Sequence, residues 1–215
     1  MSRLKEIFSN IEKAKKFADV GCDHGIIAQM VVKENLADTV IITDISKDSL
    51  KKAEDLLKEE MSVGKVKSYF TDGLNGVDLD VDECLIAGMG GKEIIKILTD
   101  RKEEFRPNRL ILQPMKNVDN LRVFLVENGY KILKDYVFKD RKFYDLIIAI
   151  KGEDSLTPNE IAFGRTNLIE KGEAFKERTQ IELDKVLKRL QNPDLSTENY
   201  FRFLGKVMQL KGLLW

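Results

Sequence analysis

From residue 17 to about residue 151, hydrophobic residues follow two alternating patterns. Short apolar runs, typical of buried strands, occupy residues 17–20, 39–43, 66–70, 83–87 and 109–113. Amphipathic stretches with apolar residues at helical spacing follow most of these runs, at about 26–35, 46–57, 94–98 and 118–128. This alternation predicts a mostly parallel sheet with helices on both faces.

The pattern changes at two later β-type runs, 131–138 and 143–151, which only Lys139-Asp140-Arg141-Lys142 separate. A link that short joins antiparallel strands, because a parallel connection needs a crossover of a dozen or more residues. Dinucleotide dehydrogenases normally keep their sheet parallel to its edge, whereas class I methyltransferases finish with such a hairpin. We therefore predict an α/β fold: a Rossmann-like, doubly wound sheet of the class I methyltransferase type, ending in an antiparallel β-hairpin.

The last part of the chain, residues 153–215, is helical in pattern. One long amphipathic helix is predicted from Leu168, Ile169, Phe175, Leu183, Val186, Leu187 and Leu190. Residues 192–197 break it, and a second helix follows over 200–213. Two such helices form an antiparallel hairpin or a small coiled coil. We expect two domains, residues 1–152 and 153–215.

Composition narrows the class of protein. The chain has 215 residues, of which 43% are hydrophobic, and its 36 basic and 36 acidic residues cancel. A neutral total argues mildly against nucleic acid as a partner, although a local basic patch can still bind it. Without a membrane-length apolar stretch or a signal-peptide core, the protein is expected in the cytoplasm. Cys22 and Cys84 have no C-x-x-C partner, so no metal site is expected.

Residues suited to a nucleoside ligand follow four of the predicted strands. Gly21 and Gly25 let the backbone approach a ligand where a helix begins, and Asp44 lies 23 positions after Gly21, where a carboxylate accepts ribose hydroxyls. Asp72 can accept a hydrogen bond from the amine of adenine. Residues 88–91, Gly-Met-Gly-Gly, open a groove beside them. Because the carboxyl ends of parallel strands share one edge, these residues predict a nucleoside cofactor site.

Two carboxylates in the first loop favour one class of cofactor. A dinucleotide fingerprint would be G-x-G-x-x-G, but here Asp19 precedes Gly21 and Asp23 follows it. An anion there would repel the pyrophosphate of a dinucleotide. S-adenosyl-L-methionine has no phosphate and carries a sulfonium and an α-ammonium group, which these carboxylates attract.

Five motifs support a more specific interpretation. The chain contains Asp19-Val20-Gly21-Cys22-Asp23-His24-Gly25, Asp72-Gly73-Leu74, Ile86-Ala87-Gly88-Met89-Gly90-Gly91, Leu112-Gln113-Pro114 and Tyr144-Asp145-Leu146. Together they resemble the bacterial tRNA adenine-22 N1-methyltransferase family over nearly the whole chain. The resemblance implies S-adenosyl-L-methionine as cofactor, tRNA as partner, and methyl transfer to ring nitrogen 1 of an adenosine in the D-arm region. Met115 departs from the family, which usually has Asn after Leu-Gln-Pro.

The strand ends and the resemblance together predict the site residues. Those expected to bind the cofactor are Asp19, Gly21, Cys22, Asp23, His24, Gly25, Asp44, Ile45, Asp72, Gly73, Ala87, Gly88 and Met89. Those expected to act in catalysis are Met89, Gln113, Tyr144 and His24. Ring nitrogen 1 of adenine carries a lone pair and no proton at neutral pH, so in-line transfer needs positioning and exclusion of water but no general base.

Each catalytic candidate also has a structural interpretation. Tyr144 can stack on the target base or pack under the hairpin, and Gln113 can bind a base edge or be a solvated strand end. Met89 can equally fill a gap beside the cofactor. His24 can contact a ligand or shape the loop.

The sequence identifies candidate RNA contacts less clearly than it identifies the cofactor site. Basic residues occur in the first 16 positions and at the hairpin tip, namely Arg3, Lys5, Lys13, Lys15, Lys16, Lys139, Arg141 and Lys142. They can contact phosphates or form a solvated face. The C-terminal helical hairpin can grip tRNA, brace the fold or dimerise, so a monomer or a weak homodimer is expected.

Two other functions fit parts of the pattern. A methyltransferase acting on a protein or a small molecule fits the cofactor site but leaves the matching substrate-side motifs unexplained. A non-catalytic S-adenosylmethionine-binding scaffold is favoured only by Met115. A NAD-dependent oxidoreductase is disfavoured by Asp23 and by the terminal hairpin.

Overall fold

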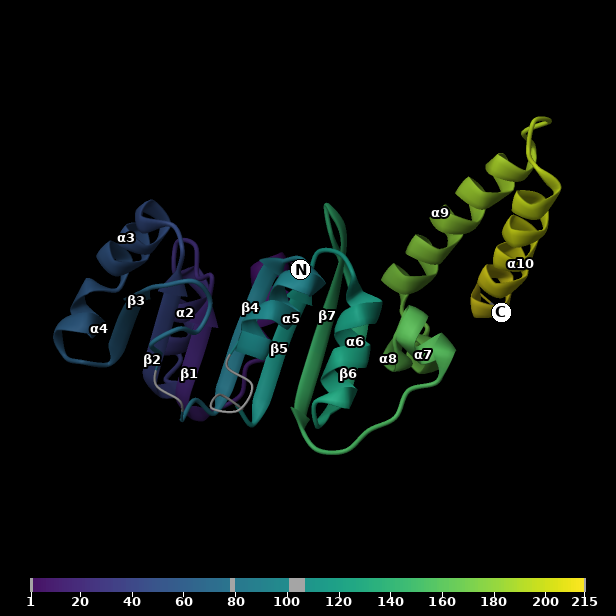
Figure 1. The fold of residues 1–215 in the computed structure, drawn as a ribbon. Coiled ribbons are helices and arrows are strands. Elements are labelled where there is room, and N and C mark those ends of the chain that lie inside the picture. Colours follow the sequence, from purple (N-terminus) through teal and green to yellow (C-terminus); the bar gives the residue numbers. More distant parts are fainter. Residues whose placement is uncertain (1, 78–79, 101–106, 215) are drawn as a thin grey trace.

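A seven-stranded sheet forms the centre of the molecule (Figure 1), and the computed structural model describes residues 2–77, 80–100 and 107–214. The strand order is β3-β2-β1-β4-β5-β7-β6. The parallel strands are β1 (Ala14–Val20), β2 (Ala37–Asp44), β3 (Val66–Phe70), β4 (Glu83–Met89) and β5 (Arg109–Pro114). β7 (Lys142–Lys151) pairs antiparallel with both β5 and β6 (Tyr130–Asp140). The predicted sheet and its terminal hairpin are confirmed.

Helices cover both faces of the sheet because successive strand residues point to opposite sides. Phe17 packs in one core cluster and the next residue, Ala18, in the other. The first face carries α1 (Arg3–Phe8), α2 (Ile26–Lys33), α3 (Lys47–Leu56) and α4 (Lys58–Ser62). The second face carries α5 (Gly91–Asp100) and α6 (Val118–Glu127).

The chain changes direction across the sheet between β1 and β4. The path runs from β1 outward through β2 and β3, then returns to place β4 on the other side of β1. Open α/β sheets bind ligands at such a switch point, in the crevice outside the carboxyl ends of the strands. The fold therefore brings the ends of β1, β2 and β4 to one place.

The C-terminal region departs from the sequence prediction. The single long helix expected from Leu168 onward is wrong, because α8 (Arg165–Glu170) and α9 (Glu173–Leu190) are separate helices. Lys171 takes a left-handed conformation with φ of 46°, and Gly172 caps α9. The hydrophobic spacing continues across this turn because both helices bury an apolar face. α7 (Pro158–Phe163) precedes them, and α9 and α10 (Thr197–Leu214) form the expected helical hairpin, which extends away from the sheet (Figure 1).

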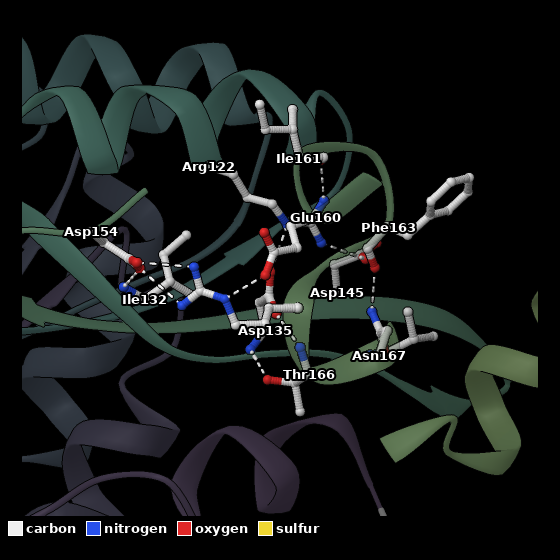
Figure 2. Close-up of polar contacts among 12 residues, drawn as sticks. Arg122, Ile132, Asp135, Asp145, Asp154, Glu160, Ile161, Phe163, Thr166 and Asn167 are labelled. Atoms are coloured by element: carbon white, nitrogen blue, oxygen red, sulfur yellow. Dashed lines mark hydrogen bonds and ion pairs between the residues drawn. The ribbon is translucent and has the colours of Figure 1, made fainter. Parts of the chain in front are cut away.

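A buried ion pair connects α7 and α8 to the sheet (Figure 2). Nε of Arg122, on α6, donates to Oδ2 of Asp135, on β6, at 2.8 Å, and the two side chains are 2% and 0% exposed. Burial raises the pKa of Asp135, and the neighbouring guanidinium partly opposes that shift. Nη1 of Arg122 donates to the Ile161 carbonyl at 3.0 Å. Oδ1 of Asp135 accepts from the Thr166 amide, also at 3.0 Å, so one pair holds α6, β6, α7 and α8 together.

Gly164 is required where α7 meets this pair. Its φ is +87°, and an added Cβ would lie 2.9 Å from both Nη2 of Arg122 and Oδ2 of Asp135. Any larger residue would press on two buried charged groups. The Gly-Arg sequence at 164–165 therefore allows α7 and α8 to approach the ion pair closely.

Candidate functional site

A pocket of about 650 Å³ opens at the carboxyl edge of the sheet, at the switch point between β1 and β4. Of the residues predicted to bind the cofactor, the pocket is lined by Asp19, Gly21, Cys22, Asp23, His24, Asp44, Ile45, Asp72, Gly73, Ala87, Gly88 and Met89. Only Gly25 of that set lies outside the lining. The sequence pattern and the fold therefore place these residues around one cavity.

The loop after β1 is held against β2 by hydrogen bonds. The amides of Gly21 and Cys22 both donate to the Thr43 carbonyl, at 2.9 and 3.0 Å. Gly21 has φ of +67°, and a Cβ there would overlap the terminal methyl of Met89. Asp23 also adopts a positive φ, 51°, which is uncommon for a residue with a side chain. This geometry keeps the backbone close to the pocket.

Gly25 has a packing role instead of a place in the lining. Its φ is +71°, and an added Cβ would lie 2.8 Å from Cβ of Ala53 on α3. The missing side chain lets the start of α2 approach α3. Close backbone approach at this position is therefore toward a neighbouring helix.

Asp44, at the end of β2, supports the same loop. Its Oδ2 accepts from the Asp23 amide at 2.9 Å and its Oδ1 from the Ser46 amide at 2.8 Å. A carboxylate oxygen has two acceptor sites, so each oxygen retains capacity for a ligand hydroxyl. Asp44 can therefore hold the loop in place and bind a ligand diol at the same time.

Three carboxyl groups make this side of the pocket acidic. Asp19 is 5% exposed, and burial raises its pKa to about 7, with Asp44 and Asp23 adding to the shift and a backbone amide contact from Ala28 opposing it. An acidic group buried beside two others is stabilised by a bound cation. The wall formed by Asp19, Asp23 and Asp44 therefore suits a cationic ligand.

Asp72 also lines the pocket and has an ion-pair partner of its own. Its Oδ2 is 3.2 Å from Nζ of Lys96, which also lines the cavity, and the Asp72 side chain is 54% exposed. The pair is a surface contact, which solvent screens. Asp72 thus keeps acceptor capacity toward the cavity.

His24 and Met89 are the two catalytic candidates in the lining. Nε2 of His24 lies 3.2 Å from Nζ of Lys52 and 3.6 Å from the Asp23 carboxylate, and the ring is 47% exposed. Met89 projects over Gly21. His24 is therefore a half-exposed residue of the lining, and Met89 lies beside the first loop.

Gln113 and Tyr144 lie outside the lining, on the β5–β7 side. Gln113 is fully buried, so its interpretation as a solvated strand end is wrong. Its Oε1 accepts from Nε of Arg3 at 2.7 Å, and its Nε2 donates to the Pro114 carbonyl at 3.1 Å. The ring of Tyr144 stacks on Phe138, with centroids 5.4 Å apart and planes 20° apart.

Arg3 connects these two residues to the pocket, and sequence reasoning missed its role. The sequence suggests only a phosphate contact or a solvated position for Arg3, but this residue lines the cavity and its guanidinium lies 5.6 Å from the centre of the Tyr144 ring. Ser2 caps α1, since its side chain accepts from the Lys5 amide, but nothing local in the sequence marks Arg3 as a pocket residue. Two other basic candidates have acidic partners: Lys16 pairs with Asp80 and Lys139 with Glu177.

The remaining expectations concern cysteines, metals and membranes. Burial raises the pKa of both the Cys22 and Cys84 thiols, which disfavours the reactive thiolate. Over residues 2–77, 80–100 and 107–214, no group of three or more His, Cys, Asp or Glu side chains is placed to hold a metal ion. Within the same ranges, no helix combines the length and apolarity that crossing a membrane requires.

The strand order, the terminal hairpin and the pocket at the β1–β4 switch point define a class I methyltransferase type of fold. A family described as "Methyltransferase domain" matches residues 1–147, more than half of the chain. The chain belongs to this methyltransferase domain family.

Curated relatives match a large part of the chain. A Mycoplasma pneumoniae protein, provisionally assigned as a tRNA methyltransferase, is 34% identical over 139 residues, which are 65% of this chain and 64% of that protein. A similarly assigned Mycoplasma genitalium protein is 33% identical over 136 residues, 62% and 60% of the two chains. The chain thus spans less than two thirds of the length of these relatives.

Solved structures match over the full length, C-terminal helices included. A Streptococcus pneumoniae protein, provisionally assigned as a tRNA (m1A22) methyltransferase, has a TM-score of 0.92 at 24% identity, covering 100% of this chain and 99% of that chain. It has also been solved with S-adenosyl-L-methionine. The Bacillus subtilis m1A22 tRNA methyltransferase TrmK has a TM-score of 0.84 at 21% identity, covering 100% and 99%. At these identities the likeness shows a shared fold.

Proposed function

We propose that this protein is an S-adenosyl-L-methionine-dependent methyltransferase that modifies ring nitrogen 1 of adenosine 22 in tRNA. The observation that carries the proposal is the full-length match of sheet and C-terminal helices to structures described as tRNA (m1A22) methyltransferases. Many methyltransferases share the sheet alone, so fold by itself would leave the substrate open. The related Mycoplasma pneumoniae protein is also assigned to tRNA.

The residues of the pocket fit this cofactor. Asp19 and Asp23 suit its cationic groups, and the Asp44 oxygens suit a ribose diol. Asp72 suits the amine of adenine, and the exposed Ile45, also in the lining, suits an apolar contact with the ring. When bound, S-adenosyl-L-methionine would supply an electrophilic methyl group on its sulfonium. Glycine at 21 and 88 would leave room for the ligand beside the backbone.

The acceptor base would enter from the side of Met89, Gln113 and Tyr144. Ring nitrogen 1 is on the Watson–Crick edge, so the target adenosine must be unpaired or flipped out to react. No protein base is needed, because that nitrogen carries a lone pair and no proton at neutral pH. The residues would orient the base and exclude water. Met89 is the candidate that touches both sides, because it lines the pocket and ends β4.

A transfer assay tests the proposed substrate class. The purified protein is incubated with S-adenosyl-L-methionine labelled in the methyl group and with three acceptors in parallel: unmodified tRNA transcripts, total protein, and a small-molecule extract. The proposal expects label only in tRNA, and an Asp44→Ala variant should lose it. Label in the protein or extract fractions, with none in tRNA, would favour the alternative methyltransferases. Cofactor binding without transfer to any acceptor would favour a scaffold.

The proposed function also bears on the location of the protein and on the role of its helical hairpin. Because a tRNA-modifying enzyme acts where its substrate is, the proposal includes a cytoplasmic location. The helical hairpin of α9 and α10 extends away from the sheet and offers a surface for tRNA beyond the target base.

A further inference from the structure

The two basic side chains of the pocket differ in whether they have a carboxylate partner. Acidic residues dominate the lining, where Asp19, Asp23, Asp44, Asp72 and Glu93 face two basic side chains, Arg3 and Lys96. Lys96 is paired with Asp72 at 3.2 Å. The side chain of Arg3 has no carboxylate partner among the described residues.

Contacts at three points hold Arg3 in place. Its backbone amide donates to Oδ2 of Asp140 at 2.8 Å, and its Nε donates to Oε1 of the buried Gln113 at 2.7 Å. The guanidinium also lies 5.6 Å from the Tyr144 ring centre, within the range of a cation–π contact. A side chain fixed in this way binds a ligand without losing further conformational freedom.

The free end of the guanidinium faces the cavity at the end of β4. A Cβ added to Gly88 would lie 2.9 Å from Nη2 of Arg3, so the tip of the side chain is directly beside that glycine. Within the described part of the chain, Nη1 and Nη2 have no hydrogen-bond or ion-pair partner. Terminal guanidinium nitrogens are suited to bind a carboxylate with two parallel hydrogen bonds.

We propose that Arg3 binds the α-carboxylate of the methionine part of S-adenosyl-L-methionine; the inference rests on the proposed function. That carboxylate is the only anionic group of the cofactor, and the lining offers it one cation without an acidic partner. Without Arg3 the carboxylate would face the acidic wall of the pocket. Arg3 thus separates the charges of a zwitterionic ligand, carboxylate at β4 and ammonium toward the carboxylates after β1.

Arg3 also links the cofactor pocket to the residues expected to contact the acceptor base. Nε of Arg3 is committed to Gln113, one of the residues expected on the acceptor side. A carboxylate bound at Nη1 and Nη2 would fix the guanidinium plane and, through it, the Gln113 amide. Arg3 is therefore a cofactor-binding residue that also positions Gln113.

Calorimetry with two ligands tests the assignment. S-adenosyl-L-methionine and decarboxylated S-adenosylmethionine differ only in the carboxylate, so the ratio of their dissociation constants measures what recognises that group. The wild-type protein should prefer the intact ligand by about 10- to 100-fold, the range expected of charge-assisted hydrogen bonds. In Arg3→Ala the preference should fall to about one or reverse. Arg3→Lys, which keeps the charge but loses the planar fork, should be intermediate.

Lys5→Ala is the matched control, because Lys5 is an exposed cation on the same helix and outside the pocket lining. It should keep the wild-type ratio. The inference is overturned if Arg3→Ala keeps the wild-type ratio, and equally if it changes only the tRNA concentration needed for half-maximal activity, which would make Arg3 a phosphate contact. If the wild-type protein binds neither ligand, the proposed function itself fails. Circular dichroism of each variant establishes that α1 and the sheet remain folded.

Discussion

Asp19 should make the ligand-free protein less stable at high pH. The group is 5% exposed, and burial raises its pKa to about 7 from 3.8. Between these two pH values the folded state holds a proton on Asp19 that the unfolded state has released, so the free energy of unfolding falls as pH rises. Stability is therefore lost as pH rises through this window and is lowest above pH 7.

The size of the effect follows from the same shift. A shift of about three pKa units changes the free energy of unfolding by about 4 kcal/mol in total. About half of this change occurs between roughly pH 5.5 and 8.5. Asp19→Asn cannot ionise, so it should gain about 2 kcal/mol of unfolding free energy over the wild type across that interval. Because Asp19 is proposed to attract the cationic part of S-adenosyl-L-methionine, this variant should also bind the cofactor more weakly at pH 8.

Urea unfolding followed by circular dichroism measures the effect at both pH values. Glu83, whose pKa burial also raises to about 7, titrates in both proteins, so its contribution cancels in the comparison. Any constant cost of the Asn amide cancels as well. If the difference in unfolding free energy between the two proteins is the same at both pH values, the argument for a buried carboxyl with a raised pKa at this position is wrong.

Three other variants test separate parts of the account. Asp23→Asn removes a charge but tolerates the positive φ, so calorimetry should show S-adenosyl-L-methionine bound several-fold more weakly, with unfolding unchanged; an unchanged affinity would contradict the charge argument. His24→Ala should lower the methylation rate while the cofactor still binds, and wild-type turnover would exclude a role for His24 in the reaction. Asp135→Ala leaves Arg122 without its ion-pair partner at 2.8 Å, which should cost about 3–5 kcal/mol of unfolding free energy. Lys176→Ala, in an exposed pair with Glu173, is its control, and equal denaturation midpoints for the two variants would contradict the structural importance of the buried pair.

The sheet could be predicted because its information is local. Each strand is a short apolar run, and the four-residue link at 139–142 already requires antiparallel strands. Pocket-lining residues such as Asp44 and Asp72 could be found because they lie at or just beyond the ends of strands, and parallel strands end at one edge. In the structure β6 and β7 extend further into the link, with Arg141 in a left-handed conformation at the turn.

The contacts that the sequence did not predict are long-range or depend on backbone conformation. Arg3 and Gln113 meet at 2.7 Å although 110 positions separate them. No periodicity in α1 marks that contact, and the polar character of Gln113 suggested a solvated position. The break at Lys171 was missed because the apolar spacing of α8 continues into α9, and only the left-handed backbone separates them.

The most direct test of the central claim is to map the methyl group. A tRNA transcript with adenosine at position 22 and its matched A22→G variant are incubated with the protein and S-adenosyl-L-methionine, digested to nucleosides and analysed by mass spectrometry. The account predicts N1-methyladenosine in the first transcript and none in the second, with a reverse-transcriptase stop at position 22 because the methyl group blocks the Watson–Crick edge. N1-methyladenosine in equal amount from both transcripts, or none from either, would contradict it.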